Sequence, residues 1–468
     1  MTNAILRGKP DAGNPHVRFD EGEVASAKPR RGSLLYKIHP AVFAVFVVLS
    51  ADAAQWQKMT GGNLDDPANW NAGYSTFAIR KAQSAPFTIS SSPTNLPGAG
   101  TLQYDNNANT YTNDFGVGGV LDLQYYSFNI KDGAQVVQRS GKILSGGTSS
   151  LAITASKNRE TGYWLDGADS AVEMPNLSLT AVAEGTAPAI YPHFAMDNGA
   201  QAMFTAVTAA GKGVIDVAGG ATLTANAISV QNGSVMTATQ ATVVVNTPSG
   251  SKLTPLEVLN GGQIEIVDST FRYTGGTTFY FNGDAGSLIS FKDSTVEFGT
   301  QRVCMIGETD GLTIRFDNST ATHTGDQLFI TGSGTSTESG DKTLVFAGAN
   351  PHLSIQGNKG FHFRGGTVSL QFEIPAAGFP TDHPVLDLTH ADAKFAKDSA
   401  TVSTLSVKVS PKCPPGVYTL LRGKNAATII SDENMSCDLD RAKFVKTQVD
   451  GVDALQLKVG GGLILLLK

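Results

Sequence analysis

From about residue 213 onward, the sequence repeats a short unit of two or three alternating apolar residues, a turn of Asn or Asp with Gly or Ser, and a second alternating pair. Leu256-Glu257-Val258, Asn260-Gly261-Gly262 and Ile264-Glu265-Ile266 form one such unit. A period of two places successive side chains on opposite faces, which is typical of a β-strand with one buried face. Asn, Asp and Gly tolerate the positive φ angles that sharp turns require. Each unit therefore predicts two short strands joined by a tight turn.

The intervals between these turns favour a solenoid. Turn residues at positions 232, 260, 293, 318 and 350 are separated by 28, 33, 25 and 32 residues, as in stacked coils that loops lengthen by different amounts. We predict an all-β fold, a right-handed parallel β-helix, with Asn232, Asn260 and Asn318 at coil corners. With about 28 residues per coil, the residues after position 53 would form about fifteen coils and a stack of about 70 Å. The alternative is several β-sandwich domains in tandem.

Composition agrees with many short strands. Charged residues make up 16% of the chain and Gly accounts for 51 of 468 residues, against averages of about 25% and about 7%. A soluble helical protein would carry more Glu, Lys and Arg on its exposed faces. The formal net charge is −6 and no basic run occurs beyond residue 40, so we expect no nucleic-acid partner. Residues 391–398 (ADAKFAKD) have the composition for two helical turns.

The first 53 residues have the features of an export signal. Residues 1–39 contain seven Lys or Arg against four acidic residues, and residues 41–49 (AVFAVFVVL) are apolar without interruption. A small-x-small sequence follows, so we predict a signal peptide with cleavage near Ala53 and a secreted or cell-surface protein. Nine apolar residues cannot cross about 30 Å of hydrocarbon as a helix, so no stable membrane span is expected in the mature chain. The alternative is a buried core strand.

The three cysteines match no zinc-binding spacing. Cys413 and Cys437 are 24 residues apart and could form a disulfide that stabilises the fold by about 3 kcal/mol. Cys304 lies between apolar residues and is expected in the core.

Short motifs stand near both ends of the predicted mature chain. Trp56, Gly61-Gly62 and residues 65–70 (DDPANW) stand near its start, and residues 126–134 (YSFNIKDGA) follow. Residues 416–421 (GVYTLL) and 454–459 (ALQLKV) stand near the other end. These motifs resemble the starting, first-coil and closing segments of autotransporter-like parallel β-helix repeat proteins of the bacterial surface. The resemblance implies an extracellular β-helix that serves adhesion or surface structure.

Together, these features predict four regions. We expect a signal peptide over residues 1–53, an N-terminal capping region over 54–110, a parallel β-helix over 111–410 and closing β-strands over 411–468.

Four acidic residues on successive units are candidates for the paired carboxylates of glycoside hydrolysis. They are Asp284, Asp293, Glu297 and Asp317. Acidic residues beside Gly, Ser or Asn are also ordinary turn residues, so we expect structural roles and predict no catalytic residue. The sequence also has no phosphate-binding loop and no Gly-x-Ser-x-Gly nucleophile elbow.

One segment has the density of ligating residues that a divalent metal site requires. It contains Asp382, His383, Asp387, His390 and Asp392. Because the segment follows Pro380 and is predicted to be a loop, we expect a structural or surface role, with no metal ligand and no cofactor.

Two aromatic runs flank the turn at residues 274–278. They are Phe271-Arg272-Tyr273 and Phe279-Tyr280-Phe281. Alternate members of a strand face outward, and exposed aromatic rings can stack on carbohydrate. We therefore predict Tyr273 and Tyr280 as binding residues, with core packing as the alternative.

These observations favour a secreted, non-enzymatic surface, adhesion or structural protein built on a β-solenoid. The expected partner is a surface glycan or another cell-surface protein. The alternative, an enzyme that degrades polysaccharides as a lyase or glycoside hydrolase on the same fold, stays open because catalytic residues on a β-helix come from different coils.

Overall fold

The computed structural model describes residues 54–461 except residues 59, 72–75, 106–108, 156–158, 182–190, 300, 308–310, 326–327 and 333–339. The described residues belong to one compact unit, Ala54–Lys468. The predicted signal peptide and its cleavage site lie outside the described residues.

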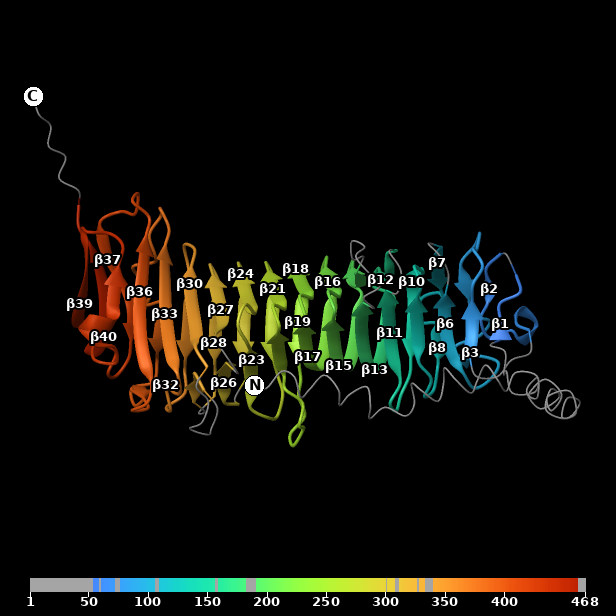
Figure 1. Cartoon of the computed structure of the whole chain (residues 1–468), viewed down its shortest axis with the longest axis horizontal. Coiled ribbons are helices and arrows are strands. Elements are labelled where there is room, and N and C mark those ends of the chain that lie inside the picture. The colour runs from blue at the N-terminus through green and yellow to red at the C-terminus, as the bar shows by residue number, and fades with distance from the viewer. Residues whose placement is uncertain are drawn as a thin grey trace, which may run out of the picture. The chain divides into compact units, whose positions relative to one another are not determined.

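The strands from β1 (Ala54–Gln55) to β40 (Val452–Val459) join one continuous sheet that winds into a solenoid (Figure 1). Each coil contributes strands to three ladders, which we call ladders I, II and III in the order in which the chain passes through them.

Ladder I is formed by the first strand of each coil. It contains β2 (Gly62–Asn63), β4 (Phe87–Thr88), β7 (Thr110–Asp114), β10 (Gln135–Leu144), β12 (Thr161–Asp166), β14 (Pro192–Asp197), β16 (Val214–Ala218), β18 (Val235–Thr239), β21 (Gln263–Val267), β24 (Leu288–Lys292), β27 (Leu312–Asp317), β30 (Lys342–Ala347), β33 (Thr367–Ile374), β36 (Val402–Val409) and β38 (Met435–Cys437). These fifteen strands of the described chain agree with the predicted number of coils.

Ladder II shares several long strands with its neighbours. It contains β5 (Thr94–Asn95), β8 (Val120–Asp122), the end of β10, the first halves of β13 (Ser170–Ala181), β15 (Gln201–Ala210) and β17 (Thr222–Gln231), then β19 (Thr242–Val245), β22 (Thr270–Tyr273), β25 (Thr295–Phe298), β28 (Thr320–His323), β31 (His352–Ile355), β34 (Leu386–Leu388) and β37 (Gly416–Arg422).

Ladder III completes each coil. It contains β1, β3 (Thr76–Ile79), β6 (Thr101–Asp105), β9 (Phe128–Lys131), β11 (Ser150–Ala155), the second halves of β13, β15 and β17, then β20 (Leu256–Leu259), β23 (Phe279–Gly283), β26 (Val303–Gly307), β29 (Phe329–Ile330), β32 (Phe361–Phe363) and β35 (Phe395–Lys397).

Pairing between successive coils is parallel throughout these three ladders, including β20 with β23 and β22 with β25. A tandem β-sandwich would instead pair most neighbouring strands antiparallel. The predicted all-β parallel β-helix is therefore confirmed, and the tandem-sandwich alternative is wrong.

Coil length varies along the solenoid. His193, Val214 and Val235 occupy one column of ladder I and are 21 residues apart, whereas Thr367 and Val402 pair across 35 residues. In the short coils, β15 and β17 pass from ladder II to ladder III without an intervening loop. Longer coils place their additional residues in loops at the corners.

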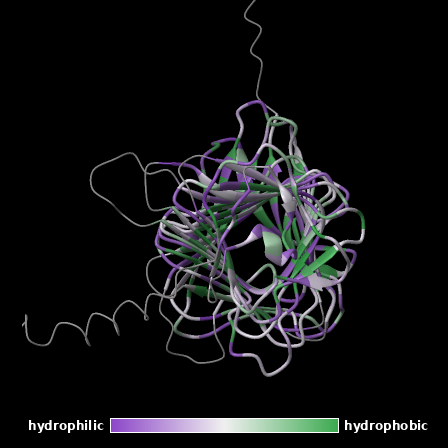
Figure 2. Cartoon of the chain, turned by 90° about the vertical axis from the view of Figure 1, so that its right-hand side faces the viewer, coloured by the Kyte–Doolittle hydropathy of each residue, from purple (hydrophilic) through white to green (hydrophobic). Residues whose placement is uncertain are grey.

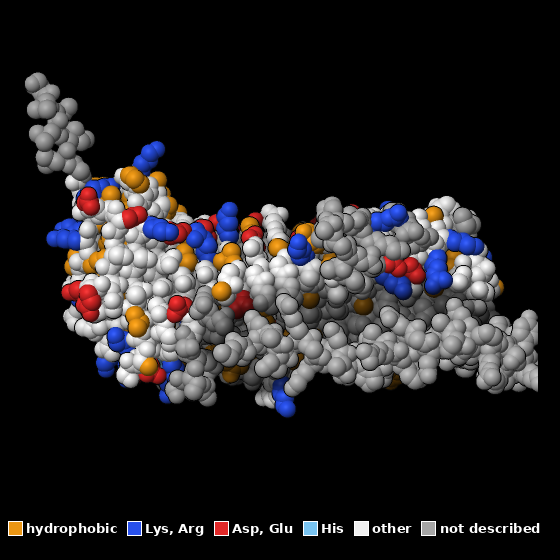
Figure 3. All heavy atoms as spheres, viewed as in Figure 1, with side chains coloured by type: hydrophobic (Ala, Val, Ile, Leu, Met, Phe, Trp, Pro, Cys, Tyr) orange, Lys and Arg blue, Asp and Glu red, His pale blue; other side chains and the backbone are white. Residues whose placement is uncertain are grey.

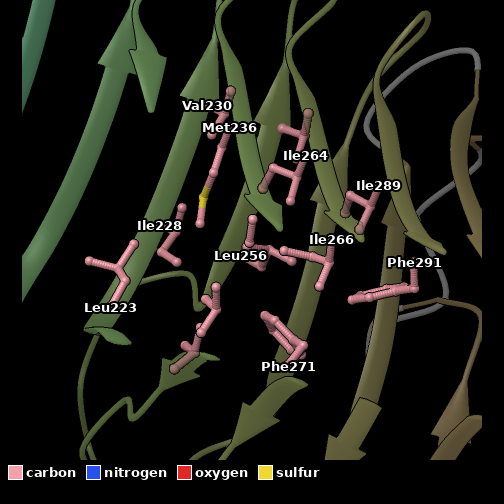
Figure 4. Packing of buried hydrophobic residues seen from close by; sticks show 14 of the residues in the cluster. Leu223, Ile228, Val230, Met236, Leu256, Ile264, Ile266, Phe271, Ile289 and Phe291 are labelled. Carbon is pink, nitrogen blue, oxygen red and sulfur yellow. The ribbon is translucent and has the colours of Figure 1, made fainter. Parts of the chain in front are cut away.

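Hydrophobic residues lie along the strands of the solenoid (Figure 2). Their side chains point into its interior and stack in register (Figure 4). Phe291, Phe316, Phe346 and Phe372 occupy one inward column of ladder I, with ring centroids 5.4, 5.8 and 5.3 Å apart and nearly parallel planes. All four rings are fully buried. The alternating sequence pattern therefore corresponds to a continuous core with one side chain per coil in each column.

The predicted corner residues have the expected backbone conformation. Asn232, Asn260 and Asn318 have φ angles of 55°, 52° and 51°. Ser294 and Ser319 are buried after the ladder I to ladder II corner, and the Ser319 hydroxyl accepts a hydrogen bond from the Ser294 amide at 3.0 Å. This contact satisfies a buried amide that the turn would otherwise leave without a partner.

The N-terminal motif of Trp56 and residues 65–70 packs against the first coils of the solenoid. Trp56 packs edge-on against Trp70 and Phe87 with centroid distances of 5.0 Å, and Asp66 caps the 3₁₀ helix η1 (Pro67–Asn69). The predicted capping region, residues 54–110, also contributes strands β1 to β6 to the ladders.

An antiparallel hairpin lies at the other end of the described chain. It consists of β39 (Ala442–Val449) and β40, and β40 also pairs antiparallel with β37. A second 3₁₀ helix, η2 (Asp432–Asn434), precedes β38.

The structure decides two local features that the sequence left open. Residues 391–398 are not helical, because Phe395 is buried and β35 pairs with β32 of the preceding coil. Cys413 and Cys437 are free thiols, and the buried Cys413 sulfur lies 3.4 Å from the Tyr418 hydroxyl. Cys304 is buried, as expected.

On the described part of the face drawn in Figure 3, basic and acidic side chains are interspersed among uncharged and hydrophobic ones. The Arg315 guanidinium, for example, contacts Asp317 at 3.0 Å and Glu373 at 2.8 Å. The pair with Asp317 lies within β27, and the pair with Glu373 joins β27 to β33, two coils further along ladder I.

Candidate functional site

Tyr273 is not a surface residue, so its prediction as a carbohydrate-binding platform is wrong. Only 1% of its surface is exposed, its hydroxyl donates a hydrogen bond to the Thr277 carbonyl at 2.7 Å, and its ring lies 4.7 Å from that of Phe279. Burial raises its pKa. The register of β22 turns Phe271 and Tyr273 inward and leaves Thr270 and Arg272 outward.

Tyr280 is half-buried on β23, between the buried Phe279 and Phe281. Its neighbour in the next coil is the buried Cys304. Its role in binding stays a prediction.

The four acidic candidates do not face one another across a groove. Asp284 accepts hydrogen bonds from the Asn260 amide at 2.8 and 2.9 Å, and Asp293 accepts one from the Asn318 side chain at 2.6 Å. Glu297 pairs with Arg272, and Asp317 with Arg315. Each carboxylate therefore has a structural partner at a corner or on a strand.

The histidine-rich segment is also dispersed. Asp387 lies in β34 and forms a bidentate pair with Arg422 at 2.9 and 3.0 Å. His383 instead contacts the side chain of Asn350 at 2.9 Å, and His390 accepts a hydrogen bond from the Asp392 amide. Within the described ranges, no group of three or more His, Cys, Asp or Glu side chains is placed to hold a metal ion.

A groove that the sequence did not predict lies at the ladder II to ladder III corner of the early coils. Three successive coils cross this corner with short loops, at residues 96–100, 123–127 and 145–149. In the next coil, β13 passes the corner without a loop. The protruding loops leave two adjoining depressions of about 310 and about 570 Å³, and Asp122 and Gln124 line both of them.

The middle loop projects an aromatic side chain into solvent. Leu123 is buried and anchors a tight turn in which the Tyr126 amide donates to the Leu123 carbonyl at 2.9 Å. Gln124 has a φ angle of 58°, which for a non-glycine residue costs on the order of 1 kcal/mol. The Asp122 carboxylate stabilises this turn by accepting from the Gln124 amide at 2.6 Å. As a result, Tyr125 is 75% exposed.

Two glycines of the next coil make room for this ring. A Cβ atom at Gly147 would lie 2.9 Å from Cδ1 of Tyr125, and one at Gly146 would lie 3.9 Å from Cε1. Gly147 also has a φ angle of 68°, which favours glycine. The ring therefore lies along the wall of the larger depression with most of its surface in water.

Polar groups line the rest of the groove. Asn95, Asp122, Leu144 and Glu173 occupy one outward column of ladder II in successive coils. Glu173 forms an ion pair with Lys142 of the preceding coil. An exposed aromatic ring beside carboxylate and amide groups can stack on one face of a ligand and form hydrogen bonds to its polar edge.

Comparisons with protein-family models, curated protein sequences and solved structures give no match for this chain. Its fold therefore defines its class, a protein built on a parallel β-solenoid. In the part of the chain that the structure describes, no helix is long and apolar enough to cross a membrane.

Proposed function

We propose that this protein is a secreted, non-enzymatic surface or adhesion protein that binds glycan chains in the groove beside Tyr125. The observation that carries the proposal is the 75% exposed tyrosine ring over a polar depression. Exposed aromatic surface is unfavourable in water, and a ligand that covers it gains about 25 cal/mol per Å² of apolar area.

A pyranose ring suits such a groove because it has an apolar C–H face and a rim of hydroxyl groups. The C–H face would stack on Tyr125, and hydroxyl groups would donate to Asp122 and Glu173 and bind the Gln124 amide. The groove is open along the corner of three coils, so it suits an internal segment of a chain better than a single small molecule.

Two sequence features support secretion of the protein and its role at the cell surface. The basic, apolar amino-terminal segment supports secretion. The resemblance of residues 56–70 and 126–134 to autotransporter-like β-helix proteins supports a role at the bacterial surface, and Tyr126 of the second motif lies in the groove.

The groove also keeps the enzymatic alternative open. Asp122 and Glu173 are two coils apart in one column, which corresponds to about 9.6 Å between their backbones. Inverting glycosidases separate their two carboxyl groups by about 6.5–9.5 Å. The Glu173 carboxylate is already paired with Lys142 of the preceding coil.

Binding and turnover should be measured on the same purified protein with one panel of oligosaccharides. We expect binding without product release, and a Tyr125→Ala variant should bind at least about tenfold more weakly, a loss of about 1.4 kcal/mol. Tyr125→Phe should retain most of the affinity because it keeps the ring. Val117→Ala is a matched control, since Val117 is 80% exposed on the same coil but lies outside the groove.

Unchanged binding in Tyr125→Ala would refute the groove as the site. Release of shorter oligosaccharides that is lost in both Asp122→Asn and Glu173→Gln would establish the enzymatic alternative instead.

A further inference from the structure

Ladder I carries a second outward aromatic platform, separate from the groove. Trp164 is half-buried on β12 and points outward between the buried Tyr163 and Leu165. A Cβ atom at Gly162 would lie only 2.4 Å from Cη2 and 2.8 Å from Cζ3 of Trp164. The six-membered ring therefore lies directly over the Gly162 backbone, and a glycine is needed there because of this close approach.

A histidine and two carboxylates adjoin the indole. His193 pairs in register with Gly162, and its ring lies 5.5 Å from that of Trp164 at 76°. Its Nε2 atom is 2.7 Å from Asp216, and its Nδ1 atom is 3.9 Å from Glu160. These side chains come from three successive coils, so only the stacking of β12, β14 and β16 brings them together.

This cluster carries a negative net charge. His193 supplies at most one positive charge against the two carboxylates. Glu160 and Asp216 have no Lys or Arg ion-pair partner among the residues that the structure describes; each contacts His193. The Gln135 side-chain amide also donates to Glu160 at 3.1 Å. The two carboxylates beside the indole attract a cation, and the indole face offers an apolar surface for stacking.

We propose that Trp164, His193, Glu160 and Asp216 form a binding site for an amino sugar with a free ammonium group. The pyranose C–H face stacks on the indole, and the ammonium group donates hydrogen bonds to the Glu160 and Asp216 carboxylates beside it. The Gln135 amide is placed to contact a sugar hydroxyl group. An N-acetylated sugar keeps the stacking but loses the charge attraction.

The test is a titration of the purified full chain with a glucosamine tetramer and with its N-acetylated counterpart, at a pH that keeps the free amines protonated. The unacetylated tetramer should bind at least about tenfold tighter, and high salt should reduce this preference. Trp164→Ala should abolish the preference for the unacetylated tetramer, because any remaining binding would then come from the groove beside Tyr125. Asp216→Asn and Glu160→Gln together should bring the two affinities to within about twofold.

Controls separate this site from the groove and from misfolding. Tyr125→Ala should leave the preference unchanged, whereas Trp164→Phe should retain the circular dichroism spectrum and part of the affinity. Equal affinity of the native protein for the two tetramers would overturn the proposal. So would unchanged binding in Trp164→Ala, or a loss of the preference in Tyr125→Ala.

Discussion

Replacement of Phe316 by alanine tests whether the stacked core stabilises the solenoid coil by coil. Phe316 is fully buried, and its ring stacks between Phe291 of the preceding coil and Phe346 of the following coil. Parallel pairing holds all three backbones in register. The neighbours therefore have little freedom to collapse into the space that the missing ring leaves.

The expected loss of stability is about 4 kcal/mol. Phe→Ala substitutions in cores cost about 3–5 kcal/mol, and the cost rises with the volume of the remaining cavity. The two lost aromatic contacts favour the upper part of this range. Phe316→Leu should cost less than Phe316→Ala, because it refills part of the volume. Thr313→Ala on the same strand should cost less than about 0.5 kcal/mol, because Thr313 faces outward.

Equilibrium unfolding in denaturant and amide hydrogen exchange together provide the assay. Because the coils of a solenoid contact mainly their neighbours, protection should fall most in β24, β27 and β30 and little in β7 and β10. A loss below about 1 kcal/mol, or an equal loss of protection in all coils, would refute the reasoning. The first result would mean that the core relaxes around the cavity, and the second that the solenoid unfolds as one unit.

Three further predictions follow from particular residues. Burial lowers the pKa of His323, against the opposing effect of its hydrogen bond to the Gln301 carbonyl. The unfolded chain therefore binds a proton at this histidine more tightly than the folded chain does. The stability that the neutral His323 contributes is present above about pH 6.5 and is lost as the pH falls toward the folded-state pKa. His323→Phe should therefore show a smaller drop in Tm between pH 7 and pH 5 than the native protein, and an equal drop would contradict this. Gly147→Ala should displace the Tyr125 ring and weaken glycan binding, because the added Cβ atom would collide with the ring. The positive φ angle of residue 147 should cost only a modest loss in Tm. Unchanged glycan binding would contradict the described position of the ring. Mass spectrometry of the secreted protein should find an amino terminus next to Ala53, and recovery of the intact chain from the cytoplasm alone would contradict the signal peptide.

The sequence by itself determined the class of fold. Alternation of apolar and polar residues specifies strands with one buried face, and Asn232, Asn260 and Asn318 mark corners because asparagine tolerates positive φ. These are local properties, and the recurrence of the unit extends them to a solenoid. The short ADAKFAKD segment shows the limit of local reasoning, because pairing of β35 in ladder III and burial of Phe395 outweigh its helical composition.

Only the tertiary structure decided which residues share a surface. A strand shifted by one residue exchanges its two faces, so composition alone could not show that Tyr273 points inward. Coil lengths that range from 20 to 35 residues also hide which side chains stack. Gly162, His193 and Asp216 are far apart in the sequence but meet at Trp164, because parallel pairing of successive coils brings their strands within about 4.8 Å of each other.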